Sequence, residues 1–251
     1  MLAQIRSASI AGVDAAAIEV EVRTGSGKEN FTVIGLGDNA VRESRDRVKS
    51  ALREAGFYVP DVVLVNLAPA ELKKEGSSFD VAIAVGILVA SDQLPFALVR
   101  DISFHGELAL DGSIRAVRGS VALAVRTVQS GIATMVVPAA NFAEARLIQG
   151  VRVVPVRSIR ELVILLKEGL YHPDEEEPPS APVTTGTHTP HRSMSEVWGQ
   201  ARAKRAMVIA AAGGHNLLMI GPPGCGKSML AERFSSILPP LTQDDLLEVV
   251  K

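Results

Sequence analysis

The feature that most limits the possible folds of this sequence is the eight-residue run Gly221-Pro222-Pro223-Gly224-Cys225-Gly226-Lys227-Ser228. It fits G-x-x-x-x-G-K-[ST] at every fixed position, the pattern of a phosphate-binding loop between a strand and a helix. In such loops backbone N–H groups point at phosphate oxygens, the lysine reaches the β- and γ-phosphates, and the serine hydroxyl holds Mg²⁺. The run therefore predicts an ATP site with Lys227 on the phosphates and Ser228 at the metal.

The residues on either side favour this interpretation. The apolar stretch 216–220 predicts a buried strand that enters the loop, and residues 228–238 predict a helix that leaves it. Before them, residues 200–212 predict another helix, which Gly213 and Gly214 end. The alternative is a chance match in a flexible glycine-rich loop, which the strand, loop and helix order disfavours.

Composition narrows the class of protein. With 47% hydrophobic and 22% charged positions among 251 residues, the chain is expected to be globular. Its net charge of −2 gives no general attraction to polyanions, so DNA binding would need a local patch. A single cysteine, Cys225, suits a reducing cytoplasm. The longest apolar run, 81–90, is shorter than the roughly 20 residues of a membrane span, so we expect a cytoplasmic protein without a membrane partner.

Residues 1–168 predict one α/β domain. Alternating segments at 18–22 and 31–34, separated by the turn 24–28, indicate a start rich in hairpins. The expected helices lie at 38–55, 79–90, 119–129, 141–148 and 158–167. The expected strands lie at 62–67, 102–110, 134–137 and 151–155, with a further short strand through Val117 after a tight turn at 111–112.

Residues 169–192 differ from both neighbouring parts. They hold an acidic run at 174–177, followed by Pro, Ser, Thr and Gly, with almost nothing to bury. This composition predicts a flexible linker. His172, His188 and His191 lie in or beside it, and we interpret them as part of the linker rather than as a metal site.

Two stretches carry a resemblance to a known family. Residues 195–224, with Gly199-Gln200 and the run Gly213 to Gly224, resemble the magnesium-chelatase branch of AAA+ ATPases, and 237–241 continue the likeness. Residues 33–36, 42–44 and 66–76 are similar to its ComM/YifB-like members. The resemblance implies a Lon-protease-like (ribosomal S5 domain 2-like) domain at 1–168 and the N-terminal part of a P-loop NTPase (AAA+) module at 193–251.

The same resemblance implies an activity. Members of this group are hexameric, ATP-driven DNA motors that promote branch migration during natural transformation, so ATP, Mg²⁺, DNA and further copies of the chain are the implied ligands and partners. Two alternatives stay open, namely the ATPase subunit of a magnesium chelatase and a nucleotide-binding assembly module that does not hydrolyse ATP. The domain at 1–168 favours the ComM/YifB-like interpretation over the chelatase subunit.

Two departures limit what is carried over. An AAA+ ATPase also needs an acidic Walker B strand, and only 23 residues follow Ser228; Asp244 and Asp245 among them lack an apolar strand before them. We therefore expect an N-terminal fragment or truncated form of a motor of about 500 residues. Ser78 takes the place of the Lon nucleophile, but no lysine occurs from Glu75 to Leu166, so peptidase activity is not expected.

Three further features of the sequence each allow a structural interpretation as well as a functional one. A helical stripe of Arg42, Arg45, Lys49 and Arg53 could touch phosphates, but interleaved acidic residues make a solvated face the better interpretation. Cys225 is expected to be a small side chain that fits its loop rather than a redox site. Trp198 is interpreted either as a neighbour of the adenine or as a packing residue.

Overall fold

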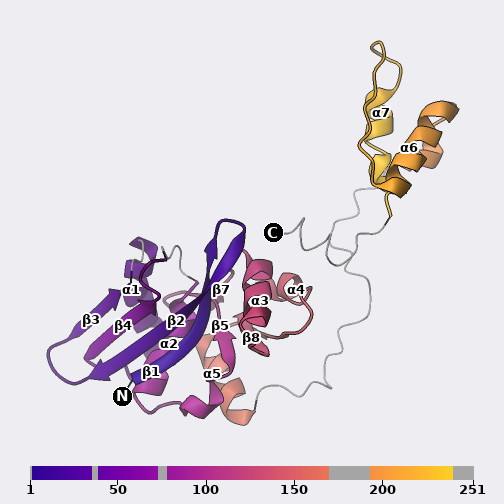
Figure 1. The fold of residues 1–251 in the computed structure, drawn as a ribbon. Coiled ribbons are helices and arrows are strands. Elements are labelled where there is room, and N and C mark those ends of the chain that lie inside the picture. The colour runs from indigo at the N-terminus through magenta and orange to yellow at the C-terminus, as the bar shows by residue number, and fades with distance from the viewer. Residues whose placement is uncertain (1, 36–38, 73–77, 170–192, 240–251) are drawn as a thin grey trace. The chain divides into compact units, whose positions relative to one another are not determined.

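Two units make up the described part of the chain in the computed structural model, which describes residues 2–35, 39–72, 78–169 and 193–239. Contacts within the chain separate the described residues 2–169, the first unit, from 193–239, the second unit. Helices and strands alternate along the first unit (Figure 1), so the chain is of the α/β class.

A mixed sheet forms the first unit. Among the described residues it has seven strands in the order β3-β4-β2-β1-β5-β8-β9, and most neighbouring pairs are parallel. The strands are β1 (Leu2–Ala11), β2 (Asp14–Gly25), β3 (Asn30–Ile34), β4 (Val62–Ala68), β5 (Ile102–Phe104), β8 (Thr134–Pro138) and β9 (Arg152–Val156). A separate pair joins β6 (Glu107–Leu108) to β7 (Ile114–Arg115), so the single strand expected at 102–110 is divided.

The start of the sheet pairs differently from the prediction. The segments on either side of residues 24–28 do not form a hairpin with each other; instead β2 pairs antiparallel with β1, through a turn at Gly12, and with β4. Strand β3 pairs only with β4 among the described residues, and that pairing is parallel. Alternation reports which face of a strand is buried, but it does not select the neighbouring strand. Helix α1 (Asn39–Glu54) makes the crossover that a parallel pair requires.

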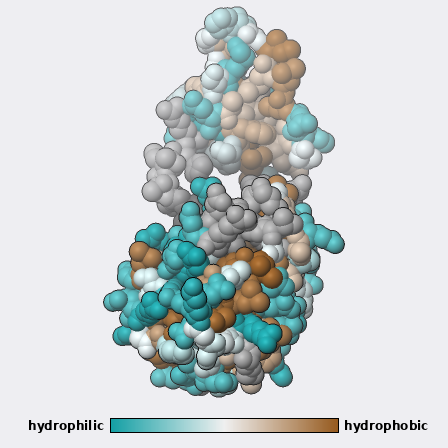
Figure 2. Space-filling view, turned by 90° about the vertical axis from the view of Figure 1, so that its left-hand side faces the viewer, coloured by the Kyte–Doolittle hydropathy of each residue, from teal (hydrophilic) through white to brown (hydrophobic). Residues whose placement is uncertain are grey.

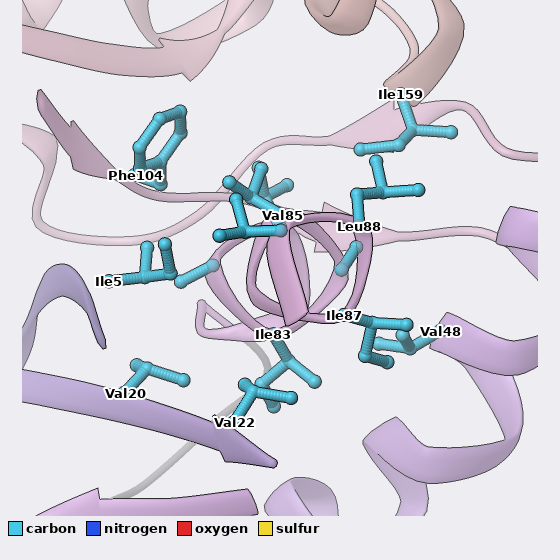
Figure 3. Packing of buried hydrophobic residues seen from close by; sticks show 14 of the residues in the cluster. Ile5, Val20, Val22, Val48, Ile83, Val85, Ile87, Leu88, Phe104 and Ile159 are labelled. Atoms are coloured by element: carbon cyan, nitrogen blue, oxygen red, sulfur yellow. The ribbon is translucent and has the colours of Figure 1, made fainter. Parts of the chain in front are cut away.

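Helix α2 (Asp80–Ala90) is the centre of the hydrophobic core. Every one of its residues is buried, and Figure 3 shows its side chains radiating toward strands and helices on all sides. Gly86 is the point of closest approach, because a Cβ placed there would lie 2.4 Å from Val22 Cγ2. The uninterrupted apolar run at 81–90 is what a helix buried all round requires.

The other helices of the first unit cover the sheet. They are α1, α3 (Ser120–Gln129), α4 (Phe142–Ala145) and α5 (Ile159–Glu168), with the short 3₁₀ turns η1 (Phe96–Leu98) and η2 (Ala139–Asn141). The Ser158 hydroxyl accepts a hydrogen bond from the Glu161 N–H and caps α5, as residue types there predict. The helix expected at 141–148 is shorter, and the expected cap of α1 at Asp38 lies outside the described residues.

The second unit is small. It contains η3 (Met194–Glu196), α6 (Ala201–Gly213), α7 (Lys227–Ala231) and η4 (Phe234–Ile237). Met194, Val197, Met207 and Leu230 form its buried cluster. Nowhere in the described ranges is a helix both long and apolar enough to cross a membrane.

Candidate phosphate-binding site

The glycine-rich run turns sharply between residues 221 and 227. Gly224 and Gly226 have φ angles of +79° and +87°, a region that residues with a Cβ rarely adopt. Gly226 is also the N-cap residue that directly precedes α7, so its conformation sets the direction in which Lys227 leaves the loop. The local chemistry of the sequence thus accounts for the curled backbone at this point.

The Lys227 ammonium lies over the loop. Its Nζ donates to the carbonyl oxygens of Gly221 at 2.7 Å and Pro222 at 2.8 Å, and it lies 3.5 Å from Cys225 Sγ. A lysine ammonium has three donors, so these contacts occupy it fully. The side chain therefore sits at the place where an anion held by the loop would replace the two carbonyl oxygens. Ser228, the candidate metal ligand, is exposed beside it.

Gln200 connects the loop to α6, a contact that sequence reasoning missed. Its Nε2 donates to the Cys225 carbonyl oxygen at 3.2 Å. The residue itself has a positive φ of 54°, which costs energy for any residue with a Cβ and is seen mainly where the surroundings impose it. The adjacent Gly199 is the only local sign of this turn in the sequence, and it does not reveal the partner.

The segment that enters the loop differs from the prediction. Residues 216–220 form no strand, and Leu218 and Ile220 are 83% and 88% exposed. A strand needs a neighbour for its backbone groups, and the described residues of the second unit contain none. Likewise the helix expected at 228–238 is confined to α7 and is followed by the 3₁₀ turn η4. Figure 2 shows hydrophobic side chains at the surface of this unit.

A hollow of about 310 Å³ lies against the loop. It is bounded by α6, by the segment before the loop and by the loop itself, through Gln200, Ala203, Ala206, Met207, Leu217, Leu218, Met219, Ile220, Cys225, Lys227 and Leu230. Trp198 does not line it and is 95% exposed. The hollow is therefore lined by apolar side chains on one side and by the Lys227 ammonium group on another.

The first unit contains a buried ion pair where α2 begins. Arg47 Nε donates to Asp80 Oδ2 at 2.8 Å, and the Leu108 N–H donates to the same oxygen at 3.2 Å. Burial raises the pKa of Asp80 to about 6, although the hydrogen bond and charge of Arg47 act in the opposite direction. The ion pair and the Leu108 hydrogen bond link α1, α2 and β6, so they hold these three elements together.

Ser78, in the nucleophile position implied by the resemblance, precedes α2. Its carbonyl oxygen accepts a hydrogen bond from the Gly106 N–H at 3.0 Å. Lys73 and Lys74 lie outside the described residues, as do the linker histidines. Across the described ranges, no three His, Cys, Asp or Glu side chains are grouped as metal ligands would be.

Comparison with known proteins gives matches in both units. A family model described as subunit ChlI of Mg-chelatase matches residues 20–141, and one described as magnesium chelatase, subunit ChlI, matches residues 193–251. The competence protein ComM of Haemophilus influenzae is 40% identical over 250 residues, which are 98% of this chain and 48% of ComM. YifB of Escherichia coli is 38% identical over 248 residues, with the same shares.

A more distant match covers 60% of this chain. A Lon protease of Xanthomonas oryzae pv. oryzae is 24% identical over 164 residues, which are 60% of this chain and 19% of that protease. The chain thus spans about half the length of ComM and YifB and a fifth of the protease.

Proposed function

Because the chain belongs to the magnesium-chelatase ChlI family and is similar to ComM and YifB, we propose that it is an AAA+ protein that binds ATP with Mg²⁺ at residues 221–228. The observation that carries this proposal is the position of Lys227 Nζ over the loop, 2.7 Å from the Gly221 carbonyl oxygen and 2.8 Å from that of Pro222. A β- or γ-phosphate oxygen replaces these carbonyls as the partner of the ammonium.

The remaining residues of the loop have separate tasks in this proposal. The backbone N–H groups at 224–227 line the anion, and the glycines permit their inward direction. Ser228 holds Mg²⁺, which neutralises charge on the phosphates when it is bound. Gln200 keeps the Cys225 carbonyl turned away from the anion, because the Gln200 Nε2 donates a hydrogen bond to that carbonyl oxygen. Leu217 and Met219 give the base or ribose an apolar wall.

For the domains we propose a Lon-protease-like, S5 domain 2-like unit at 1–168 without a protease dyad, a linker at 169–192 and the first part of an AAA+ module at 193–251. The identity to a Lon protease supports the first assignment. The matched residues span about half the length of ComM and YifB. For a protein of the length of these relatives, we propose a cytoplasmic hexameric DNA motor for branch migration. The name of ComM, a competence protein, supports a role in natural transformation.

A second candidate is the ATPase subunit of a magnesium chelatase. The descriptions of both matching family models name a subunit of magnesium chelatase, which favours this candidate. The residues that one of these models matches, 20–141, lie within the first unit. The two candidates differ in their response to DNA. A DNA motor assembles or turns over ATP faster with single-stranded DNA, whereas a chelatase subunit does not depend on it.

The direct test is ATP binding by the purified 251-residue chain. We expect Lys227→Ala to weaken ATP binding at least about tenfold, because charged hydrogen bonds to the phosphates are lost. Ser228→Ala is expected to remove the Mg²⁺ dependence of that binding. Lys167→Ala is the matched control, since it removes an exposed lysine at the end of α5 in the first unit. Equal affinities of the Lys227→Ala variant and the unsubstituted chain would contradict the assignment of the site.

Turnover of ATP is measured on the same samples, with and without single-stranded DNA. Hydrolysis requires an acidic group that activates water, and residues 1–251 contain no recognisable Walker B strand. We therefore expect turnover by these residues alone to match that of Lys227→Ala. DNA-stimulated turnover that Lys227→Ala abolishes would point to Asp244, Asp245 or Glu248 as the acid.

A further inference from the structure

The first unit contains a second hollow, far from any residue of the nucleotide proposal in sequence. It has a volume of about 340 Å³ and lies between the sheet and α3, which packs against β1 and β2. In Figure 1, α3 stands beside these strands. Its lining residues include Arg6 from β1, Glu19 from β2 and Arg126 from α3. The volume falls within the range of small-molecule sites.

The two arginines lack ionic partners in the part of the chain that the structure describes. Neither Arg6 nor Arg126 forms an ion pair with a carboxylate of the described residues. Arg126 Nε is buried and has no hydrogen-bond partner in the described part of the chain, while Nη1 lies 3.5 Å from Gln129 Oε1, at the limit of a hydrogen bond. A buried charged donor without an acceptor is costly, and a ligand that supplies an acceptor removes the cost.

The neighbouring hydroxyls do not supply this acceptor. Ser7 Oγ donates to the Phe104 carbonyl oxygen at 2.8 Å, and Thr127 Oγ1 donates to that of Leu123 at 2.8 Å. Glu19 lies directly across from Arg6 in the strand register, but it forms no ion pair with it. Two guanidinium groups and one carboxylate leave the hollow with one net positive charge. Arginine donors in a fork match the oxygens of a phosphate.

We propose that this hollow binds the phosphate group of a small molecule or a nucleic-acid strand, held by Arg126 and Arg6. Arg126 supplies the buried Nε–H, Arg6 adds a second cation from the sheet, and Glu19 weakens the site by repulsion. The room beyond a single phosphate is filled by the rest of the ligand, against Ala8, Ala17 and Pro69. The site is independent of the loop at 221–228.

Inorganic phosphate is the first probe, titrated into the ¹⁵N-labelled full chain at constant ionic strength and followed by amide NMR. All proteins carry Lys227→Ala, so that binding at the proposed ATP site does not contribute. We expect saturable shifts at residues 6–8 and 126–130. Arg126→Ala is expected to weaken binding at least about tenfold, and Arg126→Lys, which keeps the charge but not the fork, by less.

Two further variants protect the test against misfolding of the Arg126 variants. Glu19→Gln, an exposed change, is expected to tighten phosphate binding about twofold to fivefold by removing the repulsion. Arg118→Ala removes an exposed arginine that does not line the hollow and is expected to leave the affinity unchanged. An affinity that Glu19→Gln and Arg126→Lys both leave unaltered, or shifts that are confined to other residues, would overturn the proposal.

The source of the phosphate is distinguished by two further titrations. Ribose 5-phosphate offers a monoester, as on a small metabolite, and dimethyl phosphate offers a diester, as in a nucleic-acid backbone. Saturable shifts at the same amides with either compound support the site and identify the class. Failure of both, together with inorganic phosphate, refutes it.

Discussion

Asp80, the first residue of α2, and His105, which directly follows β5, are buried titratable side chains. Burial raises the pKa of Asp80 to about 6 and lowers the pKa of His105 to about 3. His105 Nε2 lies 2.8 Å from Ser103 Oγ, and its Nδ1 has no hydrogen-bond partner within the described ranges. The folded protein therefore binds a proton at Asp80 more readily than the unfolded chain does, and a proton at His105 less readily.

These two shifts act in opposite directions on stability. Between about pH 4 and pH 6 the folded state holds the Asp80 proton more tightly, so this group adds stability as the pH falls. Below about pH 6.5 the unfolded chain protonates its histidine while folded His105 stays neutral, so this group removes stability as the pH falls. The effects oppose each other in the unsubstituted protein.

We predict that Asp80→Asn makes the protein more sensitive to acid. With the opposing carboxyl gone, the free energy of unfolding is expected to drop by about 1–3 kcal/mol more between pH 7 and pH 4 than in the unsubstituted chain. Urea unfolding at a series of pH values measures this. The ion pair with Arg47 exists only where Asp80 is ionised, so its loss acts above about pH 6, and the change of stability with pH is the readout. Asp61→Asn, a change at an exposed position, serves as the control.

His105→Gln is predicted to have the reverse effect on the slope. It removes the group that resists protonation, so stability relative to the unsubstituted chain is expected to rise as the pH falls from about 6.5 to 4. At pH 7 the loss of the contact with Ser103 costs about 1 kcal/mol. An unchanged dependence on pH, measured by the same urea titrations, would show that His105 titrates normally in the folded state.

At the scale of elements, the position of α2 against the sheet depends on a missing side chain. A Cβ at Gly86 would approach Val22 Cγ2 to 2.4 Å and Val22 Cβ to 3.1 Å. Valine is stiff at χ1 and is itself completely buried, so it has little freedom to move aside. The close packing of α2 is therefore set by Gly86 and Val22 together.

We predict that Gly86→Ala destabilises the protein by about 1–3 kcal/mol, although alanine is the better helix former. The strain from the added methyl group outweighs the gain in helix propensity. The free energy of unfolding in urea measures it. The double variant Gly86→Ala, Val22→Ala is expected to lose less than the sum of the single changes, since removing two methyl groups makes room. Additive losses would mean that the two positions are not in contact.

At the scale of the whole molecule, the two units differ in how much they bury. The large core cluster lies entirely between Ala3 and Leu166, whereas the cluster of the second unit comprises four buried residues among those described. Leu218 and Ile220 are largely exposed in the second unit. Buried apolar area is the main source of stability, so the first unit is expected to carry most of it.

We predict that residues 1–169 fold on their own. Their thermal midpoint, followed by circular dichroism, is expected within about 4 °C of the main transition of the full chain, which corresponds to about 1–2 kcal/mol for a unit of this size. Residues 193–251 alone are expected to show no cooperative transition without nucleotide. A fragment 1–169 that fails to unfold cooperatively would contradict a self-contained core.

Local patterns in the sequence determined much of this protein. They located α2, α5 and α6, the alternating strands and the phosphate-loop motif, because helix periodicity, caps and glycine-rich turns act over a few neighbouring residues. Tertiary structure decided what depends on distant residues: the pairing of β3 with β4, the lack of a strand at 216–220, and the contact of Gln200 with Cys225. It also brought Arg6 and Arg126 to one hollow. Such contacts join residues far apart in the chain, and no local pattern encodes which partner each residue meets.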